Sequence, residues 1–259
     1  MPILDFNQYS APVIYPKENY KVYKYFDIIK FISLLQRKSL FFCRLDKLED
    51  KFEGSSPKLN LEYRKKYYEQ IHNELLSKNS KIEVSLEKDL KVRQGFEEEF
   101  KKLNCVCCWN KSKSESYALW KIYSEMNKGI MVTSQIDKLI NSLKNNFTND
   151  IQISEIKYID FETEMIPDGN LNYQIIHKHK AYSYEDELRL IYKVPEVNRI
   201  DFDWEKEDNN SGINIKLDLD ILIDDIVLSP YSPEWFTELV QDLMLKYGLN
   251  KKIRKSIIK

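Results

Sequence analysis

The chain has 259 residues, a length that suits one large domain or two small ones and allows a substantial buried core. Its 40 lysine and arginine residues nearly balance 41 aspartate and glutamate residues, so the formal net charge is -1. That balance excludes a histone-like protein with a large basic excess, although it leaves room for a local basic groove. The six glycines are too widely spaced for a G-x-G-x-x-G turn or a P-loop, so nucleotide binding through a glycine-rich loop is also excluded.

In chain order, the first part of the sequence predicts a helix, a strand and a charged insertion. Asp27 is suited to cap a helix whose apolar residues recur at helical spacing up to Leu35. Residues 40–44 are a short apolar run typical of a strand. Residues 58–103 are dense in Lys, Glu, Tyr and Leu. We expect about this range to form two charged helices, an insertion or a lid over the core.

The rest of the chain alternates between short predicted strands and helices. The segments are a strand over 104–109, a helix from about 114, a strand over 130–133, a helix over 137–143, strands over 153–158, 213–217 and 226–228, and a helix from about 232. Neither an internal repeat nor a linker is visible. The sequence therefore predicts a single α+β domain over residues 1–259, with a split antiparallel β core, flanking helices and the charged helical insertion.

Composition also favours a cytoplasmic protein without metal. The N-terminus lacks a secretory signal pattern, and no apolar run approaches 18 residues, so we expect no membrane contact. Cys105 and Cys108 form one C-x-x-C without a second pair, which favours buried thiols on a strand over a zinc site. His177 and His179 could supply two metal ligands, but no third ligand stands at readable spacing. We therefore expect no metal.

The pattern most suggestive of chemistry is E-x-E, formed by Glu185 and Glu187. If residues 184–192 form a strand, these two carboxylates and Arg189 project from the same face. Such a pair can divide the work of glycosyl transfer, one carboxylate stabilising an oxocarbenium-like sugar and the other orienting the nucleophile. The alternative is a surface ladder in which Arg189 pairs with Glu187 and Glu185 stays in solvent.

Further candidates surround this pattern in the sequence. Tyr23, Lys24 and Tyr25 could stack on a planar ring and hold a diphosphate, or simply pack within a strand. Each of the others has a functional and a structural interpretation: Arg44 as a ligand contact or a local ion pair, Trp120 and Tyr123 as site or core residues, and Lys178 and Lys180 as substrate contacts or a solvated edge.

Several motifs together resemble the bacterial family called domain of unknown function 2971, over nearly the whole chain. They are Tyr23-Lys24-Tyr25, Leu40-Phe41-Phe42, Asp50-x-Phe52-Glu53-Gly54, Cys108-Trp109, Glu115-Ser116-x-x-x-Trp120-x-x-Tyr123, Gly129, residues 178–189 as K-x-K-x-Y-x-x-E-x-E-L-R, Leu228-Ser229-Pro230 and Trp235-Phe236. The name of this family assigns no function.

The order of a first-strand basic or aromatic motif, a helix, a short strand and a late E-x-E also resembles, more weakly, the ADP-ribosyltransferase superfamily. This resemblance implies NAD as the substrate, bound by a split antiparallel core without a glycine-rich loop. It implies Glu187 as the catalytic glutamate and Glu185 as the residue that positions the acceptor. The implied NAD contacts are Tyr23, Lys24, Tyr25, Arg44, Trp120 and Tyr123, and the implied acceptor contacts are Lys178, Lys180, Tyr182 and Arg189.

The leading hypothesis is therefore an ADP-ribosyltransferase-like enzyme that modifies nucleic acid or protein. The resemblance also implies a toxin of an anti-phage defence or toxin–antitoxin system, with an antitoxin or another defence protein as partner. One alternative is a non-catalytic component that binds nucleic acid through Lys178, Lys180 and the insertion. Another is a protein-interaction module, if the aromatic residues form an exposed patch.

Overall fold

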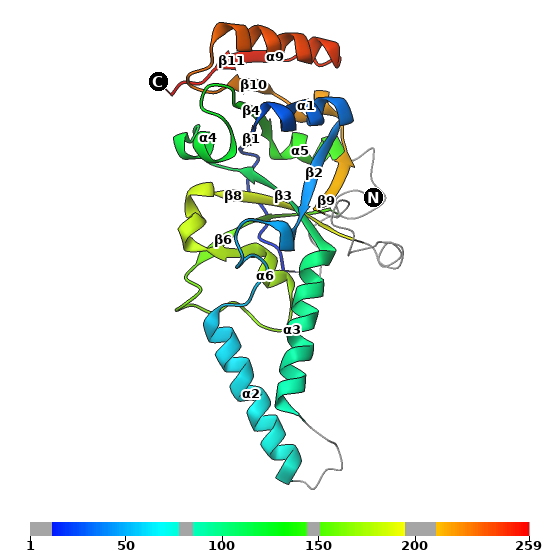
Figure 1. The fold of residues 1–259 in the computed structure, drawn as a ribbon, viewed down its shortest axis with the longest axis vertical. Helices are drawn as coiled ribbons and strands as arrows, with labels where there is room; N and C mark the ends of the chain where they lie inside the picture. The colour runs from blue at the N-terminus through cyan, green and yellow to red at the C-terminus, as the bar shows by residue number, and fades with distance from the viewer. Residues whose placement is uncertain (1–11, 78–84, 144–150, 195–210, 259) are drawn as a thin grey trace.

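The computed structural model describes residues 12–77, 85–143, 151–194 and 211–258 (Figure 1). Within these residues a nine-stranded, mostly antiparallel sheet forms the centre, with helices packed against it. Two long helices project away from the sheet and fall within residues 58–103. The predicted α+β class with flanking helices and a charged helical insertion is therefore confirmed.

The sheet begins with a strand, a helix and a second strand. β1 (Lys21–Phe26) leads into α1 (Ile28–Arg37), whose N-terminus is capped by the Asp27 side chain accepting a hydrogen bond from the Lys30 N–H at 2.7 Å. Phe31, Leu34 and Leu35 share one face of α1 and are buried, as their spacing predicted. The helix ends at Arg37, Lys38 follows as its C-cap, and β2 (Ser39–Arg44) comes next.

The main sheet has the order β11-β10-β4-β1-β3-β2-β9, and β8 joins β3 to β5. Its remaining strands are β3 (Asn104–Asn110), β4 (Ile130–Gln135), β5 (Ile151–Glu155), β8 (Glu187–Lys193), β9 (Gly212–Lys216), β10 (Asp225–Leu228) and β11 (Lys252–Lys255). The β10–β11 pair is parallel, and the other pairs of this sheet are antiparallel. A separate parallel pair joins β6 (Lys157–Ile159) and β7 (His177–His179).

The predicted split of the core lies at β3. One edge of β3 pairs with β8 along seven positions, from Asn104 opposite Lys193 to Asn110 opposite Glu187. The other edge pairs with β2 at its beginning and with β1 only at Asn110. Between these points β1 and β2 diverge, and the Lys24 ammonium donates a hydrogen bond to the Cys108 carbonyl oxygen at 2.7 Å. At the split, this strand carbonyl oxygen therefore accepts its hydrogen bond from the Lys24 side chain.

The two faces of the sheet are covered differently. The main core joins side chains of one face to α1, α5 (Ile136–Leu143) and α9 (Glu234–Lys246). The opposite face packs against two shorter helices, α4 (Tyr117–Tyr123) and α6 (Asn172–Ile176). A short helix, α8 (Leu219–Leu222), and two 3-10 helices, η2 (Leu45–Lys47) and η3 (Lys180–Glu185), complete the described elements. The candidate site lies on the opposite face, between α4, η3 and the segment after η2.

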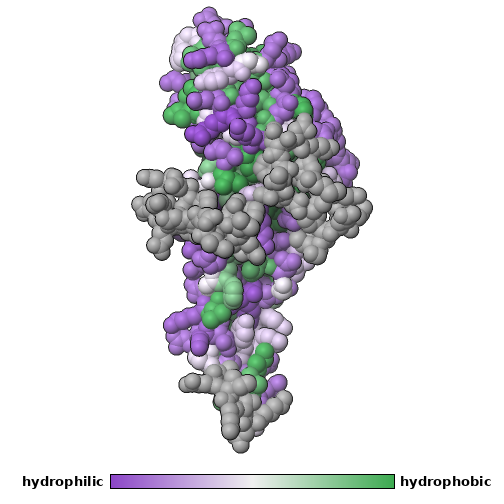
Figure 2. Space-filling model, turned by 90° about the vertical axis from the view of Figure 1, so that its right-hand side faces the viewer, coloured by the Kyte–Doolittle hydropathy of each residue, from purple (hydrophilic) through white to green (hydrophobic). Residues whose placement is uncertain are grey.

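The arm consists of α2 (Lys58–Ser77) and α3 (Leu86–Leu103), which project from the sheet (Figure 1). Arg64 anchors its base, through 2.6 Å contacts to both the Glu97 and the Asp168 carboxylates. Hydrophilic and hydrophobic residues are interspersed along the arm in Figure 2. α3 has no buried residue, and Phe96 is 64% exposed. The arm therefore contributes little to the core.

Candidate functional site

The two glutamates of the E-x-E pattern come from different local structures. β8 begins at Glu187, whereas Glu185 is the last residue of η3. Asp186 between them has φ of 39°, in the left-handed region that Asp tolerates better than most residues, and its carbonyl oxygen accepts a hydrogen bond from the Lys111 N–H at 2.8 Å. The expected strand over 184–192 is therefore wrong in its first three residues. Both carboxylates nevertheless reach the same ammonium group.

Glu187 is held almost completely inside the protein. The Arg189 Nε lies 2.6 Å from one of its oxygens and the Arg189 Nη2 lies 3.0 Å from the other. The Lys178 Nζ is 3.4 Å away, and the side chain is only 2% exposed. Burial raises the pKa of Glu187, but the charges of Arg189 and Lys178 outweigh it and lower that pKa to about 2. Glu187 is thus a fixed negative charge at neutral pH.

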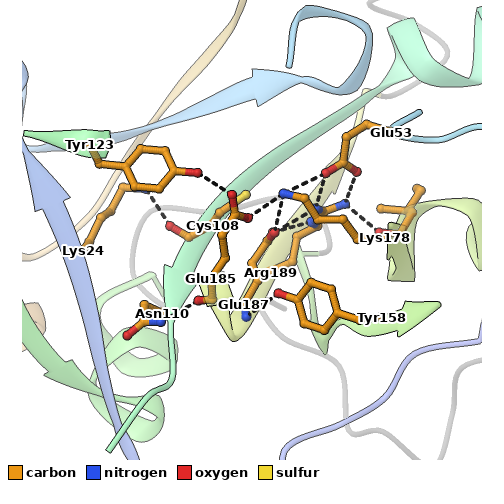
Figure 3. Close-up of polar contacts among 11 residues, drawn as sticks. Lys24, Glu53, Cys108, Asn110, Tyr123, Tyr158, Lys178, Glu185, Glu187 and Arg189 are labelled. Atoms are coloured by element: carbon orange, nitrogen blue, oxygen red, sulfur yellow. Dashed lines mark hydrogen bonds and ion pairs between the residues drawn. The ribbon is translucent and has the colours of Figure 1, made fainter. Parts of the chain in front are cut away.

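Arg189 connects Glu187 to a third carboxylate, that of Glu53. Its Nη1 and Nη2 atoms donate to the two Glu53 oxygens at 3.1 and 3.0 Å, and Nη1 also donates to the Ile175 carbonyl oxygen at 2.6 Å (Figure 3). The Arg189 side chain is 0% exposed. The predicted ladder from Arg189 to Glu187 therefore exists, but it is buried and not a surface feature.

Lys178 and Glu185 form the more accessible half of the cluster. The Lys178 ammonium contacts Glu185 at 2.5 Å and Glu53 at 3.1 Å, and it lies 4.9 Å from the centre of the Tyr182 ring. The Tyr123 hydroxyl donates to the other Glu185 oxygen at 2.6 Å (Figure 3). The pKa of Tyr123 is raised well above its ordinary value, first by burial and then by the Glu185 charge. Tyr123 is therefore a neutral donor.

A pocket of about 440 Å³ opens over this cluster. It is lined by Tyr23, Lys24, Tyr25, Leu48, Glu49, Asp50, Glu53, Cys108, Trp109, Asn110, Leu119, Ile122, Tyr123, Lys178, Tyr182, Tyr184, Glu185 and Glu187. Its volume suits a small organic molecule. The walls come from β1, β3, α4, η3 and the segment after η2, so the split sheet and the elements on its second face enclose it together.

The pocket carries a negative charge. Five of its lining side chains are carboxylates, and two, Lys24 and Lys178, are cations. With Arg189 behind Glu187 as a third cation, the balance is -2. Lys178 and Arg189 contact carboxylates, whereas no ion pair joins Lys24 to a carboxylate among the described residues. The Lys24 ammonium, which has three donors, is thus the pocket cation most available to an anionic group.

The pocket also contains a cysteine, but not a reactive one. Burial raises the pKa of the Cys108 thiol well above its ordinary value, and the charge of Glu187 raises it further. A thiol in these surroundings stays protonated, so it is a poor nucleophile. The chemistry of the pocket therefore rests on carboxylates, the lysines and tyrosine hydroxyls.

The structure brings together most of the residues singled out from the sequence and separates three of them. Glu185, Glu187, Tyr23, Lys24, Tyr25, Tyr123, Lys178 and Tyr182 line the pocket, and Arg189 supports it from behind. Arg44 instead forms a two-point contact with Asp46, at 2.8 and 2.6 Å. Trp120 is fully buried in the cluster beneath α4. Lys180 pairs with Asp160 at 2.7 Å near the surface.

Sequence reasoning overlooked the acidic segment after η2. Glu53, which binds both Arg189 and Lys178, stands in the sequence only as part of a family motif, and so does Asp50. The signal was a cluster of carboxylates in the loop that follows β2 and η2, and loops commonly carry ligand residues. Asn110 and Tyr158 were also overlooked. The Asn110 side chain donates to the Glu185 carbonyl oxygen at 2.5 Å, and the Tyr158 hydroxyl accepts from the Glu187 N–H at 2.9 Å.

Two further findings concern metals and membranes. Within the described ranges, no three or more His, Cys, Asp or Glu side chains gather as they would to hold a metal ion. His177, half of the H-x-H pair, is buried, and its Nδ1 lies 2.7 Å from the Tyr173 carbonyl oxygen. None of the helices in the described ranges has the length and apolar character needed to cross a membrane.

Comparisons with known proteins bear on the segment that holds most of the cluster. No significant match was found among curated proteins or among solved structures. A family model does match residues 119–190, which include Tyr123, Lys178, Glu185, Glu187 and Arg189, whereas Lys24 and Glu53 lie outside them. That model is described as "Protein of unknown function (DUF2971)", and residues 119–190 are therefore a DUF2971 domain. The sequence motifs predicted this family over nearly the whole chain, and the match covers only this part of it.

Proposed function

We propose that the chain is an ADP-ribosyltransferase that binds NAD in the pocket and transfers ADP-ribose to an acceptor. The observation that carries this proposal is the convergence of Glu185 and Glu187 on one pocket that also contains Lys24 and five tyrosines. Paired carboxylates in an enclosed site are the residues that glycosyl transfer requires. The absence of a glycine-rich loop agrees with a site built from side chains on strands and turns.

The charge of the pocket suits this chemistry. When the bond between C1′ of the ribose and nicotinamide breaks, its electron pair leaves with nicotinamide and the ribose becomes positively charged. A net charge of -2 around the pocket stabilises that cation, because the charges are fixed before the reaction begins. The acceptor then attacks C1′ and loses a proton to a carboxylate, which completes the transfer.

The geometry favours a division of roles that differs from the one implied by family resemblance. Both oxygens of Glu187 accept hydrogen bonds from Arg189. Glu187 is therefore best suited to holding Lys178 in place and to supplying a constant negative charge to the pocket. Glu185 has more access, since its side chain is 9% exposed and its partners Tyr123 and Lys178 line the pocket. We therefore assign the reacting carboxylate to Glu185 and a positioning role to Glu187.

The remaining parts of NAD find matching groups in the pocket. Lys24, which has no carboxylate partner among the described residues, would contact the diphosphate. Tyrosine rings would stack on the nicotinamide ring. Arg44, Trp120 and Lys180 receive no role, because none of them lines the pocket.

Turnover of NAD by purified protein tests the proposal. We expect NAD to bind, measured by calorimetry, and nicotinamide to be released, measured by chromatography. Glu185→Gln should lower release about 10²- to 10⁴-fold, because it removes an acid–base group without changing the side-chain volume. Glu162→Gln, on an exposed residue that pairs with Lys58, is the matched control and should retain activity. Failure to bind millimolar NAD, or full activity of Glu185→Gln, would refute the proposal.

A further inference from the structure

The arm exposes large apolar side chains that no described part of the chain covers. Tyr63 and Tyr67 of α2 are 57% and 52% exposed, and Val92 and Phe96 of α3 are 51% and 64% exposed. α3 buries no residue, and the buried residues of α2 are Asn60, Arg64 and His72. The arm thus buries polar side chains and leaves apolar ones in water, the reverse of what normally stabilises packed helices.

Two contacts show which sides of the two helices face each other. Arg64 contacts Glu97 at 2.6 Å. Farther from the sheet, towards the far end of the arm, the His72 Nε2 lies 3.0 Å from the Asp89 carboxylate (Figure 1). Each helix therefore faces the other with a row of residues spaced four positions apart, a row that contains these contact residues.

The exposed apolar residues lie beside the facing rows, on one side of the arm. Tyr63 and Phe96 each stand one position before a facing residue. Tyr67 and Val92 are four residues from them and share their rows. One position turns a side chain by about 100° around the helix axis, and because α2 and α3 run in opposite directions, both turns lead to the same side of the arm. We call Tyr63, Tyr67, Val92 and Phe96 the apolar face.

The other side of the arm is more polar. It is formed by the residues one position after the facing rows, which are Leu61, Lys65, Glu69, Asn73, Leu90, Gln94 and Glu98. Leu61 and Leu90 are apolar, but they lie near opposite ends of the arm. A projecting arm with one apolar and one polar side is typical of a surface that binds another protein.

The charges next to the apolar face suit a second copy of this chain. On α2, Glu62 lies nearer the sheet and Lys66 nearer the far end of the arm. The same order recurs on α3, where Glu99 lies nearer the sheet and Lys91 nearer the far end. An identical arm that runs in the opposite direction therefore brings an acid next to a lysine on both helices. The ion pairs that Lys91 and Glu99 form within α3 are exposed and contribute little.

We propose that the apolar face binds the apolar face of a second copy of this chain, with the two arms antiparallel around a two-fold axis. α2 then lies along α2 of the other copy and α3 along its α3, so that the arms form a four-helix bundle. Tyr63 packs near the partner's Tyr67, and Val92 near the partner's Phe96. This inference is independent of the proposed function.

The position and size of the apolar face fit such a dimer. Val92 and Phe96 lie in the middle of α3, six residues after its start and seven before its end, so antiparallel arms overlap along its whole length. α3 is about 27 Å long, and two helices side by side are about 20 Å wide. The two faces together bury on the order of 1,000 Å², at the lower limit for a specific interface. We therefore expect a dissociation constant in the micromolar range.

Sedimentation velocity of the full chain, from micromolar to submillimolar concentration, measures the dimer. We expect a reversible species of twice the 31.0 kDa chain mass. Val92→Glu should weaken dimerisation about 100-fold, because each dimer would bury two carboxylates in an apolar contact. Leu61→Glu is the matched control, since Leu61 is also 51% exposed but lies on the other side of the arm, and it should dimerise like wild type. Circular dichroism should show the same helix content in all three proteins.

Charge reversal tests whether the bound partner is an identical, antiparallel arm. Glu62→Lys and Lys66→Glu should each weaken dimerisation about 3- to 30-fold, because like charges then meet at two places in each dimer. A mixture of the two variants should form a heterodimer with the affinity of wild type, since both pairs of charges are again opposite. A chain that stays monomeric would overturn the inference. So would equal dimerisation of Val92→Glu and Leu61→Glu, or a mixture that does not restore the dimer.

Discussion

The pocket and the arm use charged residues in opposite ways. Each contains an arginine between two carboxylates: Arg189 with Glu187 and Glu53, and Arg64 with Glu97 and Asp168. Arg189 and its partners are at most 2% exposed, whereas the side chains of Arg64, Glu97 and Asp168 are 10%, 12% and 31% exposed. Burying an ion pair is seldom the cheapest way to stabilise a fold, because desolvation offsets much of the attraction. The buried cluster around Arg189 is therefore better explained by a site that needs fixed charges, whereas the network around Arg64 is partly open to solvent at Asp168.

The most severe test of this contrast compares the two arginines. Arg189→Met should lower the free energy of unfolding by about 3–5 kcal/mol, because it leaves Glu187 and Glu53 buried without their main cation. Arg64→Met, which keeps a similar apolar side chain, should cost about 1–2 kcal/mol, since Asp168 can turn to water. Urea denaturation of both variants measures the difference. Equal losses would mean that the base of the arm is as much a part of the core as the pocket.

The second test is the pH dependence of stability. The pKa of Glu187 is about 2 in the folded protein and about 4.5 as an ordinary glutamate. A carboxylate with a lowered pKa stabilises the fold above pH 4.5 and loses that contribution as the pH falls towards 2. The loss should be on the order of 3 kcal/mol. Denaturation curves at successive pH values should show a shallower slope in this window for Glu187→Gln than for wild type.

Asp168 provides the comparison for that measurement. Its pKa is also lowered, first by its hydrogen bond with Arg64, but its carboxylate is partly in solvent. We therefore expect Asp168→Asn to change the acid slope less than Glu187→Gln does. A larger effect at Asp168 would show that the acid sensitivity of the protein resides at the base of the arm.

The elements that follow from periodicity were predictable, and the site was predictable only in part. α1, β3 and the two helices of the arm match their expected ranges, because apolar spacing and capping residues are local signals. Residues 184–186 were expected to extend β8, since Tyr and alternating polarity favour a strand. Asp186 instead adopts a left-handed conformation that turns the chain. Tertiary contacts stabilise this turn, among them the hydrogen bond from the Lys111 N–H to the Asp186 carbonyl oxygen.

Which residues form the pocket and its cluster depends on contacts between segments that are distant in the sequence. Glu53 is 136 residues from Arg189 in sequence, and no single-sequence pattern joins them. Trp120 and Tyr123 stand three apart on α4, yet one is in the core and the other donates to Glu185. Such pairs differ only in the direction of the side chain on the helix, which the packing of α4 against β1 decides. The residue types were visible in the sequence, but their grouping was not.

A glycine beside the pocket should be sensitive to substitution. Gly54 follows Glu53 and has φ of +66°, and a Cβ there would stand 2.5 Å from Cδ2 of the buried Leu45. Gly54→Ala should therefore destabilise the protein by about 1–2 kcal/mol for the backbone alone, with more for moving Leu45. Thermal denaturation measures this loss. Unchanged stability would indicate that the segment carrying Asp50 and Glu53 rearranges at little cost.

A glycine in the arm should respond in the opposite direction. Gly95 lies inside α3, and a Cβ there would have no atom within 4 Å. Gly95→Ala should therefore stabilise the helix by roughly 0.5–1 kcal/mol, because alanine loses less conformational freedom. Amide hydrogen exchange locates the gain. Slower exchange confined to α3 would mean that the arm opens independently of the pocket, as its few buried residues predict. Equally slower exchange in β8 would show that the arm and the pocket unfold together, and a loss of stability would mean that another surface packs on Gly95.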